Sequence, residues 1–217
     1  MKDRTKYILF AVFVLFAFQT YSQTYRVKGG VNLSDFLYKS EGVNYSNLYN
    51  ITSPGFHAGA SMENQISHGL SFETGLFVSL KGLTIDALNN VYSYGGKLNL
   101  FYLDVPLTLK TTFGRRGATQ WFLAGGPWFD IGFAGNVMAL YNWAGDGQAV
   151  KEKVKWGSGE GEVKRFDIGV TVGGGIEFGD WEVGAFYDHG FPELLNGTVH
   201  SLKTRVWKIS VGYTLGY

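Results

Sequence analysis

Hydrophobic and polar residues alternate with a period of two along most of the chain, most clearly over residues 165–188. One face of this stretch carries apolar side chains at every second position, and the other carries charged residues and glycine. A period of two predicts β-strand, because successive side chains of a strand point to opposite faces. Gly179 and Asp180 interrupt the alternation, and such a pair between two alternating runs indicates a tight turn. The stretch therefore predicts an antiparallel hairpin.

The same alternation predicts eight strands in total. They span about 25–34, 55–65, 70–81, 98–111, 119–133, 165–178, 181–188 and 204–217. A tilted strand needs roughly 9–11 residues to cross a bilayer, and most of these segments are at least that long. Short connections follow the second, fourth and sixth strands, and the remaining connections are long. In barrels that cross the outer membrane, short turns face the periplasm and long loops face outside.

The apolar face of each predicted strand carries aromatic residues near its two ends and aliphatic residues between them. Tyr25, Trp121 and Tyr213 illustrate one end, and Phe56 and Trp207 the other. Two aromatic girdles around an aliphatic band are typical of a barrel that faces lipid. A soluble barrel would place its apolar residues inside instead. We therefore predict an all-β fold, an eight-stranded antiparallel up-and-down transmembrane β-barrel that covers residues 23–217.

Residues 1–22 have the pattern of a cleaved signal peptide. Three basic residues precede an apolar run over residues 7–18, and Thr20 and Ser22 are small residues before a cut at Gln23. The alternative is a membrane-anchor helix, which needs about 20 apolar residues to span a bilayer. The shorter run favours a signal peptide and export.

Composition supports export to a membrane and argues against some partners. Charged residues make up 17% of the chain, below the roughly 25% of soluble domains. The absence of cysteine excludes disulfides and thiolate metal sites. Without the leader the chain keeps 16 basic and 17 acidic residues. A balance near zero gives no reason to expect a nucleic-acid partner. We expect a location in the bacterial outer membrane, in contact with outer-membrane lipid.

Charged residues on the inward faces are the main candidate site. They offer two interpretations, an ion pathway and a structural ion-pair network that fills the lumen. Eight strands leave an interior just wide enough for side chains, and buried charges need partners, so the network is favoured. Its predicted members are Arg26, Lys28, Glu63, Glu73, Lys81, Asp104, Lys110, Asp130, Arg165, Asp167, Glu177, Glu182, Asp188 and Lys208.

Catalytic and cofactor signals are weak. His57 and His189 are candidate bases, and Asp188 precedes His189, but neighbours in a strand point to opposite faces. No spacing of metal ligands is present, and no helix follows the glycines at 173–175 as a phosphate loop would require. We therefore expect no cofactor, no metal and no enzymatic activity.

The long connections are the expected contact sites for partners. Residues 150–156 alternate charged and apolar side chains, which predicts a ribbon that rises above the membrane. The ribbon is either a solvated hairpin or a surface for a partner protein, glycan or ligand, since function concentrates on loops.

Several segments resemble a known family. The sequences at 55–82, 102–110, 122–133, 166–178 and 209–217 resemble the small outer-membrane β-barrel family of Bacteroidota, often called porin-family or PorT-like proteins. The resemblance covers nearly the whole mature chain. It implies an outer-membrane location and an eight-stranded barrel, but it implies no catalytic motif. PorT itself is linked to protein secretion through the type IX system.

Three hypotheses about function remain. The first is a non-enzymatic outer-membrane barrel that acts as a structural or partner-binding element, in an envelope assembly or a secretion machinery. The second is a narrow channel or small-ligand binder. The third is an outer-membrane lipid hydrolase.

Overall fold

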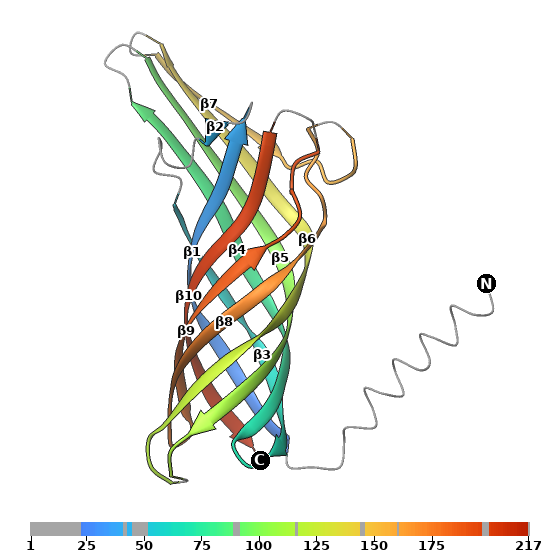
Figure 1. The fold of residues 1–217 in the computed structure, drawn as a ribbon. Coiled ribbons are helices and arrows are strands. Elements are labelled where there is room, and N and C mark those ends of the chain that lie inside the picture. Colours follow the sequence, from blue (N-terminus) through green and yellow to red (C-terminus); the bar gives the residue numbers. More distant parts are fainter. Residues whose placement is uncertain are drawn as a thin grey trace, which may run out of the picture.

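The computed structural model describes residues 23–40, 43–44, 52–88, 92–115, 117–143, 146–159, 161–196 and 200–216. These residues form antiparallel β-strands that wind into a barrel (Figure 1). The predicted signal peptide, residues 1–22, lies outside the described residues. No helix in the described part of the chain has the length and apolar character needed to cross a bilayer.

Eight strands close the ring. In ring order they are β1 (Gln23–Ser40), β3 (Ser53–Ser67), β4 (Leu70–Leu88), β5 (Tyr92–Phe113), β6 (Gln120–Trp143), β8 (Phe166–Phe178), β9 (Trp181–Gly190) and β10 (His200–Gly216). The ring is closed because β10 also pairs with β1 along nearly its whole length. Two further strands lie beyond the ring: β2 (Val43–Asn44) pairs with β1, and β7 (Asp146–Lys153) pairs with β6. The predicted eight-stranded antiparallel up-and-down barrel is confirmed.

The alternation of side chains sorts the strands into an outer and an inner surface. Along β8 the first residues alternate strictly, with Phe166, Ile168 and Val170 exposed outside and Asp167 buried inside. Large apolar side chains are exposed on the outer wall around the barrel, while charged and small polar side chains are buried in the lumen. The hydrophobic surface therefore faces outward, as the sequence predicted.

Tight turns join the strands at one end of the barrel, which we call the turn end. Gly69 lies between β3 and β4 with φ of 76°, and Gly179 lies between β8 and β9 with φ of 57°. Positive φ is costly for residues with a Cβ atom, so glycine suits both turns. The start of β1 and the end of β10 lie at the same end (Figure 1). We call the opposite end the loop end.

The strands at the loop end are longer than predicted. β4 continues to Leu88, β5 begins at Tyr92, and β6 has 24 residues instead of ending near residue 133. Much of the predicted loop 134–164 is therefore strand, because β6 first pairs with β5 and then also with β7. The ribbon predicted from residues 150–156 is seen in part, since β7 ends at Lys153 and pairs with β6.

Candidate functional site

Two groups of ion pairs cross the lumen, and the larger lies near the turn end. This turn-end network consists of Arg26, Lys28, Glu63, Glu73, Lys110, Glu177 and Glu182. Its members come from β1, β3, β4, β5, β8 and β9, so the ion pairs connect strands all round the barrel. They therefore tie together strands that do not hydrogen-bond to one another.

Lys110 is the centre of the turn-end network. Its Nζ lies 2.5 Å from Glu177 Oε1, 2.6 Å from Glu182 Oε2 and 3.1 Å from Glu63 Oε2. The same Nζ lies 4.5 Å from the ring centroid of Phe122, which adds a cation–π contact. A single buried ammonium group thus contacts three carboxylates, which also share Arg26.

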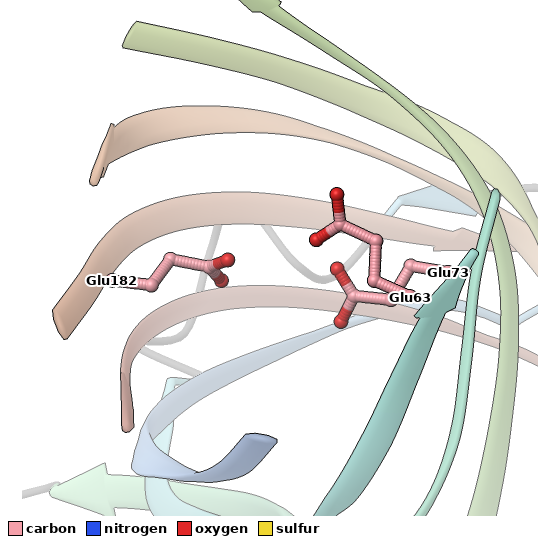
Figure 2. Close-up of side chains that lie close together, drawn as sticks. All are labelled: Glu63, Glu73 and Glu182. Atoms are coloured by element: carbon pink, nitrogen blue, oxygen red, sulfur yellow. The ribbon is translucent and has the colours of Figure 1, made fainter. Parts of the chain in front are cut away.

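Three carboxylates of this network converge as metal ligands could. Figure 2 shows the side chains of Glu63, Glu73 and Glu182 pointing toward one another. One oxygen of each lies within 4.8 Å of the others. Lys28 contacts Glu73 and lies 2.6 Å from Glu182, while Arg26 contacts Glu63. Basic side chains therefore supply the positive charge that a metal ion would bring, and the donor set does not call for one.

A smaller group of charges, the loop-end network, lies deeper in the lumen. It consists of Lys81, Asp104, Asp130, Asp188 and Lys208. Lys81 contacts Asp130, and Lys208 contacts Asp188. The two ammonium groups also lie 3.8 Å and 3.7 Å from Asp104. These charges are largely shielded from water, because Lys81 and Asp130 are each 1% exposed.

Aromatic rings and hydroxyl groups complete the surroundings of the loop-end network. Lys81 Nζ lies 4.6 Å from the ring centroid of Trp128 and 5.3 Å from that of Tyr102. Asp167 is buried nearby, and its Oδ2 accepts a hydrogen bond of 2.6 Å from Thr204 Oγ1. The deepest charges are therefore held by cation–π contacts and hydrogen bonds as well as by ion pairs.

The structure places thirteen of the fourteen predicted lumen residues inside the barrel, and twelve of them make ion pairs there. Asp167 lies inside but uses a hydrogen bond instead. The prediction was wrong for Arg165, whose side chain is exposed. Strand β8 begins only at Phe166, and Arg165 lies in a bend where its carbonyl accepts from Gly132 N. The alternation of the strand therefore does not extend to Arg165.

The lumen carries more acid than base. Among the described residues, five basic side chains face eight acidic ones. They are Arg26, Lys28, Lys81, Lys110 and Lys208 against Glu63, Glu73, Asp104, Asp130, Asp167, Glu177, Glu182 and Asp188. The excess shows in the loop-end network, where Oδ1 of Asp104 and of Asp130 has no hydrogen-bond partner in the described part of the chain. Each basic side chain therefore serves several carboxylates.

An apolar layer, here called the outer cap, covers the loop end of the lumen. It consists of Leu83, Leu98, Leu100, Tyr102, Val154, Trp156, Val163, Leu194, Leu195 and Leu202. Leu194 has no exposed surface, and the ring of Trp156 stands edge-on to Tyr102 with centroids 5.9 Å apart. A Cβ at Gly132 would lie 2.2 Å from the Trp156 ring, so glycine makes room for it. Sequence reasoning missed this cap.

Segments that fold back from two loops build the outer cap. Val163 N donates to Lys155 O, Lys164 N donates to Leu194 O, and Leu194 N donates to Leu202 O. These bonds satisfy backbone groups that burial would otherwise leave unpaired. The adjacent apolar residues Leu194 and Leu195 were the only hint of the cap in the sequence. An apolar pair within a polar loop does not show which residues it packs against.

The two ends of the lumen differ in openness. At the turn end a vestibule of about 1130 Å³ is lined by residues that include Arg26, Glu63, Thr112 and Trp181. Farther in, a cavity of about 90 Å³ lies between the two networks and is lined by His57, Phe77 and Ser210, among others. The outer cap covers the other end. The described barrel is therefore a cup that opens at the turn end.

His57 belongs to a hydrogen-bonded chain that sequence reasoning did not find. Asn32 Nδ2 donates to the carbonyls of Phe56 at 2.9 Å and Leu80 at 3.3 Å, so its Oδ1 faces His57. His57 Nδ1 lies 2.7 Å from that oxygen and must donate to it. His57 Nε2 is then free to accept from Ser210 Oγ at 3.1 Å. The order Ser–His–Asn orients the imidazole as a base toward a hydroxyl.

Asp188 and His189, the neighbours considered and rejected as a catalytic pair, lie on opposite faces of β9, as the alternation predicted. Asp188 is buried in the lumen against Lys208. His189 points outward, where its ring lies 6.4 Å from that of Tyr187 and 6.0 Å from that of Phe191. Asp188 therefore cannot orient His189.

Comparison with protein families identifies the kind of barrel. Residues 21–196 match the family described as outer membrane protein beta-barrel domain. The chain belongs to this family. Together with the apolar outer wall and the closed ring of strands, membership places the barrel in the outer membrane. Since short turns of such barrels face the periplasm and long loops face outside, we expect the turn end on the periplasmic side and the loop end outside.

Solved structures of small outer-membrane barrels are similar to this one. Ail, the attachment invasion locus protein of Yersinia pestis, solved with the heparin analogue sucrose octasulfate, has 13% identity and a TM-score of 0.41. The match covers 89% of this chain and 99% of that chain. Neisserial surface protein A has 12% identity and a TM-score of 0.40, with 90% and 99% covered. The N-terminal β-barrel domain of Pseudomonas aeruginosa OprF has 12% identity and a TM-score of 0.34, with 89% and 100% covered. No curated protein matches the chain.

Proposed function

We propose that this outer-membrane barrel is a closed, non-enzymatic anchor that presents a β-sheet outside the membrane to a partner of the cell envelope. The observation that carries the proposal is the length of the strands. β6 has 24 residues, whereas a tilted strand crosses a bilayer with about 9–11. The additional residues of β6 pair with β5 on one side and with β7 on the other. In Figure 1 this paired sheet projects beyond the loop-end ends of β9 and β10.

The filled lumen supports an anchor over a channel. Ion pairs cross the barrel at two levels, and the outer cap lies above them. A channel would need a continuous aqueous path, and an eight-stranded barrel has little room for one once side chains fill it. The cavity of about 90 Å³ between the networks is far smaller than such a path.

The resemblance to PorT-like proteins of Bacteroidota supports a role for the anchor as a subunit of an envelope assembly or secretion machinery. We also propose that residues 1–22 direct export and are then cleaved. The projecting sheet would be the contact, because the wall between the girdles is occupied by lipid.

Crosslinking tests the contact. A photoreactive residue at Val150, an exposed position on β7, should capture one discrete protein in living cells. The same photoreactive residue introduced in place of Arg115, an exposed position at the turn end, should not capture that protein. Equal capture at both positions, or capture of lipid alone, would contradict the anchor function.

Conductance separates the anchor from the narrow channel. Purified barrel in a planar bilayer should give no stepwise current across a wide range of voltages. Reproducible steps that vanish when Leu194 is replaced by the bulkier Trp would instead favour the channel.

One arrangement favours a second candidate, an acyl-ester hydrolase. Ser210, His57 and Asn32 are ordered as a nucleophile, a base and an orienting group. Methanesulfonyl fluoride is small and sulfonylates such serines with loss of fluoride. The anchor hypothesis predicts no mass increase on Ser210, whereas labelling of the native chain that is lost in Ser210→Ala and in His57→Ala would favour the hydrolase.

A further inference from the structure

Three neighbouring strands change from apolar to ionisable residues along one line on the outer wall. On β10 the outward residues from Leu215 to Trp207 are apolar or aromatic, and the next outward residue is Arg205. The register pairs Arg205 with Asp35 on β1 and with His189 on β9. Because all three positions are neighbours across the sheet, the line marks where the hydrocarbon ends at the outer side.

An aromatic platform lies directly below and beside this line. The rings of Trp207 and Tyr187 have centroids 4.8 Å apart, and His189 stacks on Tyr187. Trp207 is 59% exposed toward the membrane. Tryptophan and tyrosine concentrate at the level of lipid headgroups. Arg205 is two residues farther along the strand than Trp207, about 7 Å, so its guanidinium lies among the headgroups.

The tip of the Arg205 guanidinium can donate to a ligand. Its Nη2 donates to Asp35 Oδ2 at 2.6 Å, and its Nε is covered by protein atoms, so the exposed N–H groups at the tip are the ones within reach of a ligand. The side chain is 26% exposed on the outer wall. Arginine offers five N–H donors in a planar fork that matches phosphate oxygens. Lys203, two residues farther out on the same face, would add a second positive charge.

The wall next to this line carries a local excess of positive charge. Lys203 and Arg205 lie there, and Asp35 is the acidic neighbour that the register places opposite Arg205. This part of the wall therefore attracts anions at the level of the outer leaflet.

We propose that Arg205, assisted by Lys203, binds a phosphate group of lipopolysaccharide, the phosphorylated glycolipid of the outer leaflet, while Trp207 and Tyr187 pack beside its acyl chains. The outward position of Arg205 excludes a lumen ligand, and its place at the loop end favours the outer leaflet over the inner one. Asp35 holds the guanidinium in place, but it also competes with the phosphate for the same donors.

Lipid titration of the purified full-length barrel in detergent tests the site. Native mass spectrometry would count bound lipopolysaccharide for the wild type and for Arg205→Gln. Binding should weaken at least about tenfold in Arg205→Gln, because a hydrogen bond to a charged group is lost. Lys203→Gln should weaken binding by less, because a lysine acts as a point charge without the planar fork. The control Arg115→Gln removes an exposed arginine at the periplasmic end and should leave binding unchanged.

A second variant that should strengthen lipopolysaccharide binding keeps the test decisive even if Arg205→Gln folds poorly. Asp35→Asn frees the Arg205 donors and should tighten lipopolysaccharide binding. Weaker binding in Asp35→Asn would overturn the proposal, as would equal binding in Arg205→Gln and the wild type. Phosphatidylglycerol is the competing ligand. If it bound as tightly as lipopolysaccharide, and if Arg205→Gln weakened the binding of both lipids equally, the assignment to the glycolipid would be overturned.

Discussion

The lumen is filled by different surroundings near its two ends. The turn-end network borders a vestibule, and its side chains Glu63 and Glu177 remain 15% and 16% exposed. The loop-end network lies beneath the outer cap, and Asp130 and Asp188 are 1% exposed. Water can therefore share the desolvation of Glu63 and Glu177, whereas protein contacts must stabilise Lys81, Asp130 and Asp188. The comparison indicates that ion pairs with similar distances contribute differently to the stability of the fold at the two ends.

The largest effect is expected where the lumen is driest. Lys81→Met leaves Asp104 and Asp130 without their shared cation in a buried site, and losing one partner of a buried pair costs about 3–5 kcal/mol. Urea unfolding of the barrel in lipid vesicles, followed by tryptophan fluorescence, measures this loss. Lys153→Met on exposed β7 is the control and should change stability by less than about 0.5 kcal/mol. A small effect of Lys81→Met would mean that water reaches the loop-end network.

A smaller effect is expected for the outer cap. Leu194→Ala removes a side chain with no exposed surface, and such changes cost roughly 2 kcal/mol or more. We expect a value near the lower limit, since the loop that carries Leu194 can settle into the space. The matched control Leu215→Ala removes an outward leucine, which lipid replaces. If both variants lost equal stability in the same unfolding assay, the cap would not be a packed layer.

The smallest effect is expected at the open end. Glu177→Gln removes one of four carboxylates that share Arg26, Lys28 and Lys110, so the remaining charges balance. Partly exposed pairs contribute about 0–1 kcal/mol, and removing an excess acid should leave stability within about 0.5 kcal/mol of the wild type. Urea unfolding at low and high salt checks this. A loss comparable to that of Lys81→Met would erase the distinction between the two ends.

Much of the fold follows from the alternation of residue types. A period of two assigns each side chain to one face, and the preference of charged groups for the lumen and of apolar groups for lipid tells which face is which. This reasoning placed Asp130, Lys110 and Lys208 inside and Trp207 outside. It also placed the turns at Gly69 and Gly179, because glycine and polar residues interrupt the apolar runs there.

The partners of each side chain came from the tertiary structure. Arg26 and Glu177 are 151 residues apart and meet because the ring closes. Local pattern carries no information about such distances, so it could not show that Lys110 holds three carboxylates or that Asn32 and Ser210 flank His57. It also failed at Arg165, which stands one residue before its strand and outside the pleat.

Sequence alternation is a property of neighbours along one strand, and it is enough to specify a barrel with an apolar outer surface and a polar interior. Closure of the ring is a property of strands far apart in the chain. Only that closure decided which charges pair, where the loops fold back as an apolar cap, and which end stays open, because each of these depends on distances across the lumen.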